Sequence, residues 1–129
     1  MQDRSDGRDK ADIVDTSLGL EFINALHPVD YKYDYRECYD VVSIESPVNK
    51  ITSFPKDGSK KRNRFHHGLV AQEVKQVLDK LGIDFGGYQD HKINGGCDVL
   101  TLGYTEFIGP LIKAVQELSK RVEELEGKK

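Results

Sequence analysis

A serine and a lysine five residues apart open this chain, and the pair has the residue types needed to cut a peptide bond. They stand at the two ends of the stretch Ser5-Asp6-Gly7-Arg8-Asp9-Lys10. A serine hydroxyl becomes a nucleophile when a base removes its proton, and a neutral lysine amine can be that base. A lysine in water has a pKa of about 10.4, so such a base must be desolvated or lie beside a cation. The spacing alone identifies no catalytic pair, because 32% of the residues are charged.

Three further motifs follow the serine motif along the chain. They are Leu26-His27-Pro28-Val29-Asp30-Tyr31, then Phe65-His66-His67-Gly68-Leu69-Val70-Ala71-Gln72-Glu73-Val74, and then Leu102-Gly103-Tyr104-Thr105-Glu106-Phe107. In this order the four motifs resemble the C-terminal intramolecular chaperone domain of phage tailspikes, neck appendages and endosialidases. The same module occurs in the myelin regulatory factor family. The resemblance covers nearly the whole chain.

The resemblance implies a homotrimer that cuts itself from the upstream part of its own polypeptide. Ser5 matches the family's nucleophile and Lys10 its lysine, while Asp6 and Arg8 fit the motif as residues that hold the nucleophile loop in place. His66 matches the family's histidine. Its functional interpretation is a proton carrier or a donor to the developing oxyanion, and the alternative is a structural histidine between a strand and a helix.

Ring size predicts which peptide bond is cut. The Ser5 hydroxyl can reach the carbonyl of Arg4 through a five-membered ring, whereas attack on its own carbonyl needs a strained four-membered ring. We therefore place the scissile bond between Arg4 and Ser5. We expect burial of Lys10 only in an assembled trimer, so that cleavage waits for folding.

Length and composition predict one domain with a modest core. The chain has 129 residues, is 37% hydrophobic and contains no tryptophan. Its net charge of −3 gives no overall attraction to nucleic acid or to an anionic membrane, and we expect neither as a partner. We expect no transmembrane helix and no signal peptide, since no long apolar run is present and the first residues are polar. Cys38 and Cys97 are expected to be free thiols.

The first two thirds of the chain alternate between helical and extended patterns. Apolar residues at helical spacing predict a helix over 18–26, with Asp12 or Asp15 as its N-cap and an end before Pro28. A tyrosine at every second position from Tyr31 to Tyr35 predicts a half-buried strand, and a second extended stretch follows over 41–44. Residues 40–64 are expected to form a protruding hairpin arm that contains an Asp57-Gly58 turn.

A second amphipathic helix is predicted over 70–81, because its apolar residues share one face and Gly82 is a suitable C-cap. The glycine-rich residues 83–100 are predicted to be loop with short extended pieces. The last helix is expected to start near Tyr104, with Pro110 marking a kink or its first turn.

The last helix carries a heptad pattern. Its seam consists of Ile108, Leu111, Val115, Leu118, Val122 and Leu125. β-Branched residues at heptad positions a with leucine at positions d favour a coiled coil of two chains. The family resemblance implies three chains, and we expect the trimer. The alternative is a monomer whose last helix lies with this face on its own core.

The chain also contains candidate residues for two other kinds of site. His66, His67, His91 and Cys97 have zinc-ligand side chains, but their spacing matches no common zinc pattern. A basic run, Lys60-Lys61-Arg62-Asn63-Arg64, could contact phosphates or an acidic surface of the upstream stalk. We expect no metal, no cofactor and no nucleic-acid partner.

These observations predict an α+β domain with a protruding arm and a C-terminal coiled-coil helix. Residues 1–11 would form the cleavage motif, 12–103 the globular part and 104–127 the coiled coil. The resemblance implies a chaperone that trimerises and registers an upstream phage tailspike or appendage, made in the host cytoplasm, and then releases itself near Ser5, before or during virion assembly. The alternatives are a trimerisation cap that does not cleave and the processing domain of a membrane-anchored transcription factor.

Overall fold

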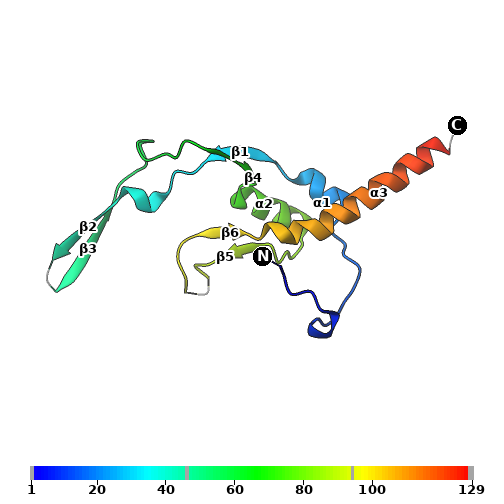
Figure 1. Cartoon of the computed structure of the whole chain (residues 1–129), viewed down its shortest axis with the longest axis horizontal. Coiled ribbons are helices and arrows are strands. Elements are labelled where there is room, and N and C mark those ends of the chain that lie inside the picture. The colour runs from blue at the N-terminus through cyan, green and yellow to red at the C-terminus, as the bar shows by residue number, and fades with distance from the viewer. Residues whose placement is uncertain (1, 46, 94, 128–129) are drawn as a thin grey trace. The chain divides into compact units, whose positions relative to one another are not determined.

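The computed structural model of the chain describes residues 2–45, 47–93 and 95–127. The chain forms two compact units (Figure 1). The first comprises Met1–Leu26 and Ala71–Lys129, and the second comprises His27–Val70. Within the described residues the α-helices are α1 (Leu20–Ala25), α2 (Ala71–Leu81) and α3 (Ile108–Glu126). The prediction of an α+β chain that ends in a long helix is confirmed.

Helix α2 follows its sequence pattern closely. Val74 and Leu78 lie one turn apart on the same face and are buried. Gly82 ends the helix with a φ of 66°, a left-handed conformation that glycine adopts without steric cost. The Ile83 amide donates to the Leu78 carbonyl at 3.0 Å, which satisfies a carbonyl that the helix end would leave unpaired. The predicted C-cap is therefore confirmed.

Helix α1 is shorter than predicted, and its predicted cap is wrong. The helix begins at Leu20, with Gly19 at the N-cap position and no side-chain cap. Asp12 and Asp15 lie in the irregular chain before it, too far from the first turn to accept its amide protons. The predicted end is confirmed, because the helix stops at Ala25, before Pro28.

Three phenylalanines form the centre of the first unit. The ring of Phe22 on α1 lies 5.3 Å from that of Phe85 and 6.1 Å from that of Phe107, measured between centroids. The rings of Phe85 and Phe107 meet edge to face at 4.7 Å. All three side chains are buried. Phe85 comes from the glycine-rich stretch that was predicted to be loop, so this stretch supplies part of the core.

Short pieces of structure precede the long helix. Strands β5 (Tyr88–Asp90) and β6 (Leu100–Leu102) pair antiparallel. The 3-10 turn η3 (Tyr104–Phe107) leads directly into α3, which begins at Ile108. Pro110 therefore lies in the first turn of α3, where the missing N–H of proline costs no helical hydrogen bond.

The second unit contains two separate antiparallel pairs. Strand β1 (Val29–Lys32) pairs with β4 (Phe65–Gly68), and Tyr31 lies opposite His66. The prediction of a strand continuing through Tyr35 is wrong, because β1 ends at Lys32 and the turn η2 (Arg36–Tyr39) follows soon after. Tyr39 is buried there, where its hydroxyl donates to Asp34 at 2.8 Å and accepts from the Lys60 amide at 3.0 Å.

The second pair forms the hairpin of the expected arm. Strand β2 (Asp40–Glu45) pairs with β3 (Val48–Ser53), and in the described part of the chain neither pairs with another strand. Apolar side chains along it are exposed, among them Val42, Ile44 and Ile51. The Asp57-Gly58 turn is confirmed: Gly58 has a φ of 84°, and the Asp57 carboxylate accepts from the Ser59 amide at 2.9 Å. Across residues 2–45, 47–93 and 95–127, no helix has the length and apolarity of a membrane span.

Candidate self-cleavage site

The turn that follows Ser5 places Lys10 beside it. Gly7–Asp9 form the short 3-10 turn η1, in which the Asp9 amide donates to the Asp6 carbonyl and the Lys10 amide to the Gly7 carbonyl. This turn reverses the chain between the two candidate residues. As a result, the Lys10 ammonium Nζ donates a 2.7 Å hydrogen bond to Ser5 Oγ. A nucleophile within hydrogen-bond reach of its base is the geometry that serine activation requires.

Asp6 and Arg8 hold this turn. One carboxylate oxygen of Asp6 accepts from the Arg8 amide at 3.0 Å, and its other oxygen accepts from the Arg8 guanidinium at 2.7 Å. The hydrogen bonds from the Arg8 side chain and amide lower the pKa of the Asp6 carboxyl below its usual value. Because the Arg8 charge is engaged by Asp6, it is not a free cation for Lys10. These contacts fit the supporting role that the resemblance implied for both residues.

The candidate site is open to solvent in the single chain. Ser5, Lys10 and every other described residue up to Ser17 are exposed. Asp12 has a φ of 53°, which turns the chain shortly after Lys10. Ile13 and Val14 then lie with 74% and 82% of their surface exposed. Neither side chain of the candidate pair is therefore buried in the single chain.

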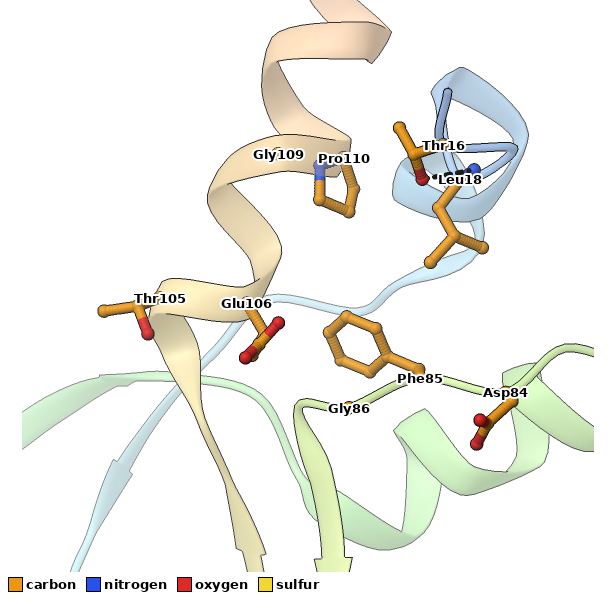
Figure 2. A pocket seen from close by; sticks show the side chains of 9 residues that line it. All are labelled: Thr16, Leu18, Asp84, Phe85, Gly86, Thr105, Glu106, Gly109 and Pro110. Carbon is orange, nitrogen blue, oxygen red and sulfur yellow. Dashed lines mark hydrogen bonds between the residues drawn. The ribbon is translucent and has the colours of Figure 1, made fainter. Parts of the chain in front are cut away.

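A pocket of about 280 Å³ lies elsewhere in the first unit. Figure 2 shows the Phe85 ring between Pro110 of α3 and the Asp84-Phe85-Gly86 segment, with Glu106 beside it. The pocket carries the carboxylates of Asp84 and Glu106 and the hydroxyls of Thr16 and Thr105. Its lining includes neither Ser5 nor Lys10, so the candidate dyad is not placed in this pocket.

His66 belongs to the second unit and lies among aromatic rings. Its ring is 4.8 Å from that of Tyr33 and 5.9 Å from that of Tyr31. On the neighbouring position of β4, His67 Nδ1 lies 2.5 Å from the carboxylate of Asp30, its partner across the strands. The aromatic packing suits the structural interpretation of His66, and its catalytic role stays a prediction.

The face of α3 that contacts its own core is not the heptad seam. Pro110 and Ala114 are the buried residues of α3. Every residue of the seam is at least 45% exposed, from Val122 at 45% to Leu125 at 67%. The alternative in which this face lies on the domain's own core is therefore wrong for the single chain. Six apolar side chains in heptad register stay exposed, whereas soluble monomers seldom expose a continuous apolar stripe.

The described residues gather no cluster of three or more histidine, cysteine or acidic side chains that could hold a metal ion. Cys38 and Cys97 are free thiols, as predicted.

Sequence reasoning missed a hollow in the second unit. It has a volume of about 530 Å³ and is lined by Tyr33, Tyr35, Arg62, Asn63, Arg64 and His66. The tyrosine repeat and the basic run are each evident in the sequence, but they are about thirty positions apart. Only the pairing of β1 with β4 brings them together.

The comparison with protein families identifies the class of this domain. Residues 5–83 match the sequence profile of a family described as "chaperone of endosialidase", which is also named as a peptidase family. This match covers more than half of the chain and begins at Ser5. The chain therefore belongs to the chaperone of endosialidase family. No curated protein and no solved structure matches it significantly.

Proposed function

We propose that this chain is a C-terminal intramolecular chaperone that trimerises an upstream phage tailspike or appendage and then releases itself. The observation that carries the self-cleavage is the 2.7 Å hydrogen bond between Lys10 and Ser5. The family, with its chaperone and peptidase designations, supports both halves of the proposal.

In the proposed reaction, Ser5 Oγ attacks the carbonyl carbon of Arg4. The neutral Lys10 amine takes the hydroxyl proton and passes it to the Ser5 nitrogen as the Arg4–Ser5 amide bond breaks. The acyl group is then an ester on Ser5 Oγ. Water hydrolyses this ester, which leaves a carboxylate on Arg4 and restores the Ser5 hydroxyl behind a new amino terminus.

Assembly supplies what the single chain lacks. The exposed seam of α3 would associate with two other copies, because burial of apolar surface contributes about 25 cal/mol per Å². Three chains held in register raise the local concentration of the upstream segments, which must form slow, non-local contacts. Burial of Lys10 in the same assembly would favour its neutral form and couple cleavage to trimerisation.

The hairpin β2–β3 is the element we propose to contact the upstream stalk. An isolated two-stranded hairpin is at best marginally stable in water. This one exposes apolar side chains and has no further strand partner within the described residues. A folding β-structure would offer it both apolar surface and free strand edges.

The test is the intact mass of this domain fused to its native upstream segment. We expect wild type to release a fragment that begins at Ser5, and Ser5→Ala and Lys10→Ala to remain whole. Ser119→Ala and Lys92→Ala change the same residue types at exposed positions outside the turn and should cleave like wild type. Analytical ultracentrifugation of the uncut Ser5→Ala fusion should give a trimer.

The exposed seam also fits a trimerisation cap that does not cleave. An intact trimer for wild type would favour that function and leave Ser5 and Lys10 as surface residues. A processing domain of a membrane-anchored transcription factor would require a DNA-binding domain in the upstream segment. A β-structural stalk there would instead support the phage assignment.

A further inference from the structure

The hollow of the second unit has the chemistry of a receptor for carboxylates. The Tyr33 and Tyr35 rings stack at 5.0 Å with an interplanar angle of 9°, and the Arg62 guanidinium lies 5.9 Å from the Tyr35 ring. The Arg62 amide donates to the Tyr33 carbonyl at 2.8 Å, which ties the basic segment to the tyrosines. Arginine recognises planar oxyanions through paired hydrogen bonds and stacks on aromatic rings.

The arginines of this hollow have no acidic partner of their own. Arg62 and Arg64 are exposed, and neither makes an ion pair with any residue in the described ranges. The hollow's lining contains no carboxylate. The surrounding loop, residues 56–64, carries five cations and only one carboxylate, that of Asp57. This surface is therefore complementary to a short acidic segment.

The chain itself carries such a segment. Residues 11–17 contain two carboxylates, Asp12 and Asp15, and no cation. Between them lie Ile13 and Val14, which are exposed and have no apolar surface to cover them in the single chain. The segment would present two apolar side chains with an anion on each side of them. That arrangement suits a surface built of two arginines and the faces of two tyrosines.

We propose that the hollow formed by Tyr33, Tyr35, Arg62 and Arg64 binds residues 11–17 of a second copy of this chain. The inference rests on the self-association in the proposed function and adds a specific contact to it. Lys10 directly precedes the bound segment, so docking would order the turn that carries Ser5 and Lys10 and bring a neighbour's surface over the Lys10 amine. Cleavage would then depend on an adjacent chain.

Zero-length cross-linking tests the contact directly. A carbodiimide joins a lysine amine to a carboxylate only when the two groups meet, and Lys60 and Lys61 flank the hollow. We would refold an equimolar mixture of ¹⁴N and ¹⁵N full-length Ser5→Ala chains, cross-link it and sequence the peptides. We expect Lys60 or Lys61 of one chain joined to Asp12 or Asp15 of another, so that some cross-linked peptides pair a ¹⁴N with a ¹⁵N peptide. The inference would be overturned if every such link joined peptides of the same isotope, or if a confirmed trimer gave no such links.

Charge reversal tests the consequence for cleavage. Arg62→Glu with Arg64→Glu should slow release of the upstream segment by about tenfold, which corresponds to about 1.4 kcal/mol. Adding Asp15→Lys and Asp12→Asn should restore most of the rate, since asparagine tolerates the left-handed backbone of Asp12. Lys80→Glu with Lys92→Glu makes the same change in net charge at exposed positions outside the hollow and should leave the rate unchanged.

The outcomes separate this inference from the proposed function. A wild-type fusion that neither trimerises nor cuts contradicts the proposed function itself. A wild type that does both, beside a charge-reversed variant that cuts at the wild-type rate, contradicts only the docking of residues 11–17. A slowed variant that the second pair of substitutions fails to rescue also counts against the docking.

Discussion

Lys10 Nζ lies 2.7 Å from Ser5 Oγ, and both side chains are exposed to solvent. The covalent chemistry of the candidate site is therefore arranged by six consecutive residues, without help from the core. The burial that the proposed assembly would give the amine is absent from the single chain.

Lys10→Arg should abolish cleavage while leaving the fold unchanged. Arginine keeps the positive charge and can still donate to Ser5, but it stays protonated and cannot act as a base. We expect the rate of release, measured by gel densitometry of the fusion, to fall at least about a hundredfold. The thermal midpoint should stay that of Ser5→Ala. Cleavage at a wild-type rate would show that the base is another group.

Arg8→Ala should raise the pKa of Asp6 toward 3.8, because the first cause of its lowering is the hydrogen bond from the Arg8 side chain. A carboxyl whose folded pKa is lowered stabilises the turn fully above the unfolded value, and this contribution is lost as the pH falls below 3.8 toward the folded pKa. The measurement is an NMR titration of the Asp6 carboxyl carbon in the Ser5→Ala background. Arg8→Lys, which keeps the charge without the paired hydrogen bonds, should give an intermediate midpoint.

Charged residues in the α3 seam should block both assembly and cleavage. Ile108→Asp with Val115→Asp places carboxylates on the exposed apolar face, where association would bury them unpaired. We expect a monomer by ultracentrifugation, native-like circular dichroism and an uncut fusion. Gln116→Asp with Ser119→Asp adds the same two carboxylates to α3 outside the seam and should still trimerise. A cleaving monomer would contradict the coupling of cleavage to assembly.

Gly87→Ala should destabilise the first unit by about 1–3 kcal/mol. A Cβ at Gly87 would lie 2.5 Å from the buried Phe85 ring and 2.9 Å from Glu106 Cβ, and the ring has no room to move within the aromatic core. Gly109→Ala is the matched control, since no atom beyond its chain neighbours and its own helix backbone lies within 4 Å of the added Cβ, and alanine favours the helix. Urea denaturation of both variants measures the difference. Equal stabilities would mean that the Phe85 region can repack.

Local sequence patterns predicted the helix, cap and turn that depend on interactions between residues close in the chain. The helix around Val74 and Leu78, its Gly82 end and the Asp57-Gly58 turn depend on neighbours within a few residues, and the structure confirms each of them. The wrong predictions concern competition between elements. The tyrosine repeat predicted a strand through Tyr35, but β4 offers a partner only from Phe65 to Gly68, so pairing stops at Lys32.

The sequence by itself determined the serine–lysine spacing, the heptad seam and the membership of the chaperone of endosialidase family. These features depend only on residue types at short, fixed intervals. Only the tertiary structure decided that Phe85 joins the core, that the seam of α3 faces away from its own core, and that Tyr33 and Arg64 line one hollow. These depend on contacts between residues far apart in the chain, which form only where the burial and pairing of whole elements outweigh the entropy of closing the intervening loops.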